Sequence, residues 1–161
     1  MKLYTGLRPL WLTVGLFAGF SSGAAQTTAP DDLAAVRKQA DSITTVIGTA
    51  LAQQDTALLA SALSDTVGIV LPGNKKLDSK AKAVKYFPLL MQTVGGGKLE
   101  KTRLAIEKIA GYESLAREAG TYRLTRVSEA GVTQEWRGQY TIYWKRNDTE
   151  LVIERLFVTK Q

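Results

Sequence analysis

The sequence predicts an α+β fold in which helices come first and strands follow. Apolar residues recur at helical spacing between about residues 32 and 97, interrupted by one short strand. After Gly97 the pattern changes to a period of two, over four long segments separated by turn residues. Helices followed by a run of strands are typical of α+β domains with an antiparallel meander. We therefore expect three N-terminal helices packed on one antiparallel sheet.

The first two helices are predicted over residues 32–53 and 56–63. Asp31 and Asp32 stand where a helix N-terminus favours acidic residues, and Asp55 is interpreted as the N-cap of the second helix. The second helix is expected to bury Leu58, Leu59 and Ala62. The apolar residues of the first helix keep helical spacing for about five turns: Leu33, Val36, Ala40, Ile43, Ile47, Ala50 and Leu51.

A short strand and a third helix complete the first half of the chain. The strand is predicted over residues 67–71, and a turn follows at residues 72–74. Asp78 or Ser79 is expected to cap the helix. Pro88 should bend or shorten it, because proline removes a helical hydrogen-bond donor. Its buried face is predicted to carry Ala81, Val84, Phe87 and Met91.

A glycine run at residues 95–97 is interpreted as the connector between helices and strands. It follows a helix and lacks the Lys-Ser/Thr partner of a phosphate loop. Turns are expected at Gly111, at Gly131 and at Asn147-Asp148. The strands between these turns are predicted over residues 98–109, 114–127, 134–145 and 150–159.

The N-terminus has the pattern of a signal peptide. Lys2 and Arg8 form a positive region before a short apolar segment at residues 10–20, and small residues follow at 23–25. This segment has about half the length that a membrane anchor needs, so we expect cleavage after Ala25 and no stable membrane insertion afterwards. The protein is expected to be exported, to the periplasm or outside the cell. The predicted organisation is a signal peptide at residues 1–25, a linker at 26–31 and one domain at 32–161.

Composition excludes several kinds of site. The 161-residue chain contains no Cys and no His, so disulfides, thiol nucleophiles, zinc–thiolate sites and a Ser-His-Asp triad are excluded. We expect no metal and no cofactor. The formal net charge of the chain is +6. Its basic residues are spread along the sequence, with the exception of one cluster. Three of the cluster's lysines do not share a helix face, so we expect no nucleic-acid partner. The cluster consists of Lys75, Lys76, Lys80, Lys82 and Lys85.

Several segments, taken in order, carry a family resemblance. They are residues 54–56 (QDT), 63–65 (LSD), 116–122 (AREAGTY), and 137–146 (RGQYTIYWKR) with the turn at 147–148. From residue 32 to the end, the chain resembles the SnoaL-like and DUF4440 group of the nuclear-transport-factor-2-like (NTF2-like) superfamily. The resemblance implies a strongly curved sheet wrapped around the first helix, with an apolar pocket inside this cone. It also implies a homodimer formed through the outer face of the sheet.

The residues that would carry a known activity of this superfamily are replaced. Relatives carry an Arg-Asp pair on the closing strand, where this chain has Arg155 and Leu156. Ketosteroid isomerases of this fold use an Asp base, with a Tyr and a protonated Asp as oxyanion donors. The strand position of that protonated acid falls at Thr141. The resemblance therefore implies a fold without choosing a function.

Strand alternation predicts which residues of the last hairpin share a face. A turn at Asn147-Asp148 would place Lys145 opposite Glu150. Both faces are largely apolar, so we expect the helices to cover one and a second subunit to cover the other. Trp136, Tyr140 and Trp144 are interpreted as core or interface residues. By the resemblance, the more polar side faces the pocket, which gives the predicted ligand site Gln139, Thr141, Tyr143, Glu154 and Leu156.

Three functions remain open. The first is a binding module that holds a small apolar or amphipathic molecule in the cone, which suits a chain without His, Cys or a clear acid–base pair. The second is a dimerising structural or interaction protein without pocket function. The third is an isomerase- or cyclase-type enzyme with Glu154 as general base and Tyr143 as hydrogen-bond donor. Glu154 could instead form an ion pair with Arg137 or Arg123. The sequence favours the binding module over the other two functions, and it favours a protein without catalytic activity over an enzyme.

Overall fold

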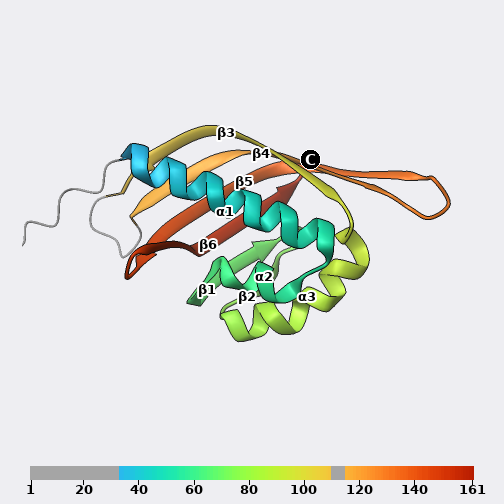
Figure 1. The fold of residues 1–161 in the computed structure, drawn as a ribbon, viewed down its shortest axis with the longest axis horizontal. Helices are drawn as coiled ribbons and strands as arrows, with labels where there is room; N and C mark the ends of the chain where they lie inside the picture. Colours follow the sequence, from blue (N-terminus) through green and yellow to red (C-terminus); the bar gives the residue numbers. More distant parts are fainter. Residues whose placement is uncertain (1–32, 110–114) are drawn as a thin grey trace, which may run out of the picture.

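The computed structural model describes residues 33–109 and 115–161, which form three helices and six strands (Figure 1). The predicted signal peptide, the linker and the turn at Gly111 lie outside the described residues. The helices are α1 (Leu33–Gln53), α2 (Thr56–Ser61) and α3 (Lys80–Val94). The strands are β1 (Leu63–Leu71), β2 (Lys75–Leu77), β3 (Lys98–Lys108), β4 (Ala116–Val127), β5 (Thr133–Asn147) and β6 (Glu150–Lys160).

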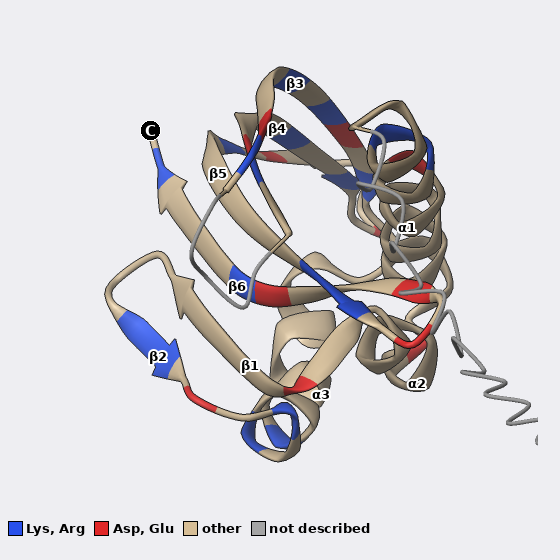
Figure 2. Cartoon of the chain, turned by 90° about the vertical axis from the view of Figure 1, so that its left-hand side faces the viewer, with Lys and Arg blue, Asp and Glu red and all other residues tan. Residues whose placement is uncertain are grey.

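The strands form one curved sheet in the order β2-β1-β6-β5-β4-β3. The four long strands, β3 to β6, are antiparallel neighbours, as predicted. β1 pairs parallel with β6 and antiparallel with β2, so the sheet is mixed. The short hairpin partner β2 was not predicted. Figure 2 shows the sheet curving from β3 to β2, with α1, α2 and α3 on its concave side.

α1 follows the predicted pattern. α2 ends at Ser61, two residues before its predicted end, because β1 begins at Leu63, and α3 departs further from its prediction. Val36, Ala40, Ala50 and Leu51 of α1 are buried, and Asp55 caps α2 by accepting a hydrogen bond from the Leu58 N–H at 2.8 Å. Ser79 caps α3, which runs on through Pro88. None of the helices in the described ranges is both long and apolar enough to cross a membrane.

The predicted buried face of α3 was partly wrong. Phe87 and Met91 are buried, but Ala81 and Val84 are exposed. The helix packs on α2 and β1 through a stripe that begins at Ala83. The predicted stripe began two residues earlier, and therefore included residues that face solvent.

The last hairpin pairs two residues away from the predicted register. Asn147 pairs with Glu150, because the chain turns within Asp148 and Thr149, with Asp148 at a φ of 53°. Asp is one of the few residues other than Gly that adopts this conformation readily. At the turn, β5 is therefore longer than predicted, whereas β6 begins at residue 150 as predicted.

A bulge at Glu154 then changes which residues of β6 share a face with β5. Across the bulge, the pairing passes from Trp144–Ile153 to Tyr143–Arg155. A bulge adds one residue to one strand, so the residues after it point to the opposite side from the one that unbroken alternation predicts. Leu156 consequently lies opposite Ile142 instead of Gln139.

Candidate functional site

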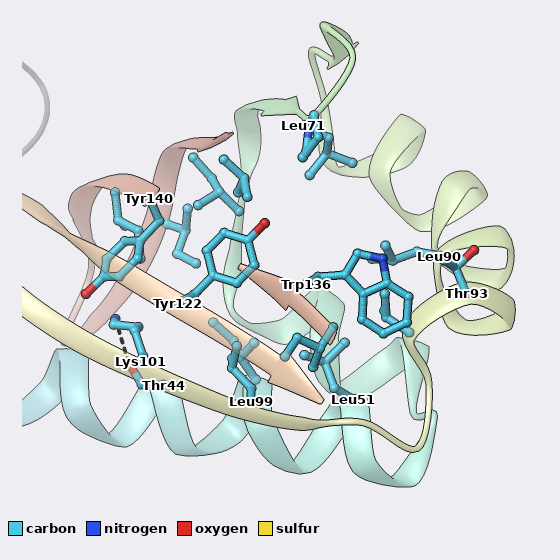
Figure 3. A pocket seen from close by; sticks show the side chains of 18 of the residues that line it. Thr44, Leu51, Leu71, Leu90, Thr93, Leu99, Lys101, Tyr122, Trp136 and Tyr140 are labelled. Carbon is cyan, nitrogen blue, oxygen red and sulfur yellow. Dashed lines mark hydrogen bonds between the residues drawn. The ribbon is translucent and has the colours of Figure 1, made fainter. Parts of the chain in front are cut away.

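A cavity of about 350 Å³ lies between the concave face of the sheet and helices α1 and α3 (Figure 3). Small-molecule sites occupy roughly 300–1,000 Å³ and are lined mostly by apolar side chains with a few polar groups. The lining here is of that kind. α1 provides Thr44, Ile47 and Leu51, α3 provides Tyr86, Leu90, Thr93 and Val94, and the strands provide Leu99, Lys101, Tyr122, Leu124, Trp136, Tyr140, Ile142, Ile153, Leu156 and Val158, with Leu71 and Pro72 beside them.

The cavity has a rim and an inner end. Pro72 and Thr93 are exposed and lie at the rim, whereas the lining residue Tyr140 is buried. In Figure 3, Tyr140 lies beside Lys101 and Thr44 at one end, Thr93 lies at the other, and Tyr122 and Trp136 lie between them. The polar groups of the inner end thus face a largely apolar body.

A buried ionic cluster closes the inner end. Its centre is Glu118 on β4, which has no exposed surface. The Glu118 carboxylate lies 2.8 Å from the Lys101 ammonium and 3.2 Å from Nε of Arg103. It also accepts hydrogen bonds from the Tyr140 hydroxyl at 2.9 Å and the Trp144 indole N–H at 3.0 Å. Each carboxylate oxygen therefore has partners, which a buried charge requires. We call these five residues the Glu118 cluster.

The cluster shifts the pKa values of its members. Burial on its own would raise the pKa of Glu118, but the Lys101 ammonium, with Tyr140 and Arg103, outweighs it and holds that pKa below its ordinary value. Burial lowers the pKa of Lys101, and the attraction of Glu118 offsets this only in part. Burial, together with the adjacent Glu118 carboxylate, raises the pKa of Tyr140. Glu118 is thus an anion at neutral pH, and Tyr140 a hydrogen-bond donor.

Lys101 is the only charged residue that lines the cavity within the described parts of the chain. Its side chain is 11% exposed. Its Nζ donates a hydrogen bond to Oγ1 of Thr44 at 2.9 Å and lies 4.7 Å from the centre of the Tyr140 ring. The Thr44 hydroxyl donates in turn to the Ala40 carbonyl, so it presents a lone pair to Lys101. α1 and the sheet therefore hold the ammonium between them.

Two reciprocal glycine–tyrosine pairs position the aromatic lining. Gly120 lies opposite Tyr140, and Tyr122 lies opposite Gly138. A Cβ atom at Gly120 would come within 2.6 Å of the Tyr140 ring, and one at Gly138 within 2.9 Å of the Tyr122 ring. Each tyrosine thus lies across the bare backbone of the facing glycine, and both rings reach the cavity.

Sequence reasoning did not identify the Glu118 cluster or this tyrosine pair. The tyrosine pair does have a sequence signal, which is a Gly-x-Tyr triplet that occurs at 120–122 (GTY) and again at 138–140 (GQY). The two triplets lie on neighbouring antiparallel strands. Glu118, Lys101 and Arg103 carry no comparable signal. They lie in strand segments with other charged residues, and only the pairing of β3 with β4 brings them together.

The predicted ligand residues lie mostly away from the cavity. Of the five, Leu156 lines it, and Gln139, Thr141 and Tyr143 do not. Alternation along β5 was predicted correctly, but the resemblance assigned the pocket to the wrong side of that strand. The bulge at Glu154 then returned Leu156 to the cavity side. Trp136 and Tyr140, interpreted as core or interface residues, line the cavity, and only Trp144 is fully buried.

Glu154 and Tyr143 do not meet in the cavity. The Glu154 carboxylate accepts hydrogen bonds from the hydroxyls of Ser64 at 2.7 Å and Thr66 at 3.1 Å, and lies 3.9 Å from the Lys145 ammonium. It therefore joins β6 to β1. The Tyr143 ring packs edge-on against Phe157, with ring centres 6.0 Å apart. Phe157 is 40% exposed, and the homodimer through the outer face stays a prediction.

Several charged residues outside the cluster form ion pairs with each other. Lys80 lies 3.7 Å from Asp65, and Lys82 lies 2.7 Å from Asp78. Figure 2 shows basic and acidic residues interspersed along β3 and β4. Within the ranges that the structure describes, no group of three or more Asp and Glu side chains could hold a metal ion.

Comparison with known proteins gives structural likeness only. No model of a protein family matches the chain, and no curated protein matches it. Among solved structures, a protein of unknown function from Mycobacterium tuberculosis is 14% identical with a TM-score of 0.70, and the match covers 81% of this chain and 75% of that one. An NTF2-like protein of unknown function from Shewanella oneidensis is 14% identical with a TM-score of 0.62, and the match covers 77% and 98%. A ketosteroid isomerase-like protein from Erwinia carotovora atroseptica is 17% identical with a TM-score of 0.59, and the match covers 76% and 94%.

These likenesses show the fold, and it is the fold that the sequence resemblance implied. Helices packed on the concave face of a curved, unclosed mixed sheet are common to this chain and its structural neighbours. At such low identity, the activities of the neighbours do not transfer residue by residue.

Proposed function

We propose that this chain, which has the NTF2-like fold, is a binding protein that holds a small apolar or amphipathic molecule in the cavity described above. The observation that carries the proposal is the cavity itself, with about 350 Å³ of space, a largely apolar lining and a charged group, Lys101, at one end. Such a site favours ligands by burying their apolar surface, at roughly 25 cal/mol per Å². The few polar groups orient the ligand.

The geometry gives less support to the isomerase or cyclase alternative. A general base must lie within hydrogen-bond reach of the proton that it removes. Glu154 is instead bound by two hydroxyls of β1 and does not line the cavity. Glu118 lies nearer the cavity, but it is covered by its own partners and has no exposed surface. Neither carboxylate is placed to act on a bound molecule.

A fluorescence titration tests the binding function. Nile red is a neutral dye that emits strongly outside water, and we expect saturable binding of one dye per chain. Val158 lines the cavity, so Val158→Trp should fill part of it and weaken binding by about tenfold or more. Val127→Trp is the matched control. Val127 is 64% exposed and does not line the cavity, so this variant should bind as the parent does.

Either of two results would contradict the proposal. One is the absence of saturable binding to the parent protein. The other is equal binding by the Val158→Trp and parent proteins, with both folded by circular dichroism. Native mass spectrometry of the purified protein would add the identity of the ligand, as a mass that is released on unfolding.

The proposal includes export of the protein, which the pattern of residues 1–25 supports. Export would place the cavity among molecules of the periplasm or the medium. Cell fractionation with N-terminal sequencing checks this step, and we expect the mature chain to begin at Gln26. Recovery from the cytoplasm of a chain that begins at Met1 would refute export. It would leave the proposal that the cavity binds a small molecule unaffected.

A further inference from the structure

At the inner end of the cavity, two cations lie beside one fully buried carboxylate, and the side chains of Lys101 and Arg103 are 11% and 23% exposed. Lys101 and Arg103 share one buried carboxylate, that of Glu118. Arg103 also lies 2.7 Å from Asp41, but the Asp41 side chain is 65% exposed. Solvent and salt screen an exposed charge far more than a buried one. The described groups around the inner end therefore leave one cation under-compensated.

Lys101 is the cation that faces the cavity. An ammonium group has three N–H donors, and the described residues provide Nζ with two oxygen partners, from Glu118 and Thr44, besides the faces of the Tyr140 and Trp144 rings. Arg103 is not among the residues that line the cavity. A molecule that enters the cavity thus meets the positive charge only at Nζ of Lys101.

We propose that the ligand is a monoanionic amphiphile, whose carboxylate binds Nζ of Lys101 while its apolar chain extends past Tyr122 toward the rim. This inference rests on the proposed binding function and names the chemical class of its ligand. A carboxylate would supply the missing negative charge and accept the remaining N–H of Lys101. Hydrogen bonds between charged partners are about twice as strong as neutral ones.

The nearby Glu118 carboxylate does not prevent this arrangement. It is fully buried, and it keeps three other donors, from Arg103, Tyr140 and Trp144, when Lys101 turns toward a ligand. Burial also lowers the pKa of Lys101, so its ammonium gains from any anion placed beside it. The walls beyond Lys101 are apolar, and they include Leu99, Leu90 and Leu156. They suit a hydrocarbon chain.

Displacement of Nile red by matched compounds tests the head group. Dodecanoate and 1-dodecanol share a chain length and differ in the charged end. At pH 8 we expect dodecanoate to bind the parent protein about tenfold more tightly than 1-dodecanol. Dodecylamine, whose ammonium would face Lys101, should bind more weakly than the alcohol.

Two variants and one control assign the preference to Lys101. Lys101→Met should abolish the preference by weakening dodecanoate about tenfold relative to 1-dodecanol. Lys101→Arg keeps the charge and should keep the preference, and it provides a second variant if the methionine variant fails to fold. Lys98→Met removes a 79% exposed lysine from the same strand and should change nothing.

The outcomes separate this inference from the binding function. Equal affinity for dodecanoate and 1-dodecanol, with Nile red bound, would overturn the anionic ligand and leave the binding function standing. A preference that survives in Lys101→Met would overturn the assignment to Lys101. The absence of Nile red binding to the parent protein would overturn both.

Discussion

The hydroxyl of Tyr140 donates a hydrogen bond to the carboxylate of Glu118 at 2.9 Å, although the two residues are not cross-strand partners. Tyr140 lies opposite Gly120, and its ring crosses the glycine to reach Glu118 two residues away. A side chain at residue 120 would occupy the space of the ring. The glycine therefore permits the hydrogen bond that joins the aromatic lining of the cavity to the Glu118 carboxylate.

Gly120→Ala should destabilise the protein and disrupt the inner end of the cavity. The new Cβ would meet the Thr102 carbonyl and the Tyr140 ring, and backbone atoms cannot move away without breaking strand pairing. Overpacking of this kind costs about 1–3 kcal/mol or more. Urea unfolding measures the loss.

Gly68→Ala is the matched control for this change. Gly68 lies in β1, and a Cβ there would meet nothing within 4 Å. Its effect should stay within about 0.5 kcal/mol. Equal effects of the two substitutions would show that the ring does not need the bare backbone of Gly120.

Glu118→Gln should be among the most destabilising polar substitutions in the described chain. It removes the buried charge between Lys101 and Arg103 and leaves two cations facing each other. Breaking a buried ion pair by removing one partner costs roughly 3–5 kcal/mol. Chemical denaturation checks the value, with Glu107→Gln as the control. Glu107 is an exposed carboxylate paired with Arg117, and such pairs contribute about 0–1 kcal/mol. A loss below that of the control would mean that the cluster does not stabilise the fold.

Glu118 also predicts a specific loss of stability in acid. The pKa of Glu118 is below its ordinary value in the folded protein, so the unfolded chain binds the proton first as the pH falls. The stabilisation is complete above the unfolded pKa of about 4.3, and it is lost as the pH drops through the lower folded pKa.

The measurement is the free energy of unfolding between pH 7 and pH 3 in high salt, which screens the exposed carboxylates. The parent protein should lose more stability than Glu118→Gln over the acid part of this range. Parallel curves for the two proteins would exclude Glu118 as the source of the acid sensitivity.

Much of the fold could be predicted from the sequence because its elements carry local signals. The apolar spacing from Leu33 to Leu51 needed only the 3.6-residue period, and the turn at Asp148 only its residue type. The parallel pairing of β1 with β6 could not be predicted from local patterns. It joins segments about ninety residues apart, and the hydrogen bonds of Glu154 to Ser64 and Thr66 that accompany it are equally distant in sequence.

The candidate site was harder to predict because it depends on register. A single bulge at Glu154 decides that Leu156 faces the cavity. Glu118 looks like a surface carboxylate in the sequence, since it follows Arg117 on an alternating strand. It is buried because β3 places Lys101 and Arg103 beside it and α1 covers that end of the sheet. Charge patterns on strands thus identify a buried cluster only when the pairing is known.

Glu154→Ala should reduce stability and leave ligand binding intact. The carboxylate accepts hydrogen bonds from Ser64 and Thr66, and the Ser64 hydroxyl is buried, so it would lose its partner without gaining water. An unsatisfied buried hydroxyl costs about 1–3 kcal/mol. Nile red affinity should not change, because Glu154 does not line the cavity. Glu150→Ala, at an exposed position beside the hairpin turn, is the control and should be nearly neutral. A Glu154→Ala protein of unchanged stability that no longer binds the dye would instead place Glu154 at the ligand, because only direct contact would then connect it to binding.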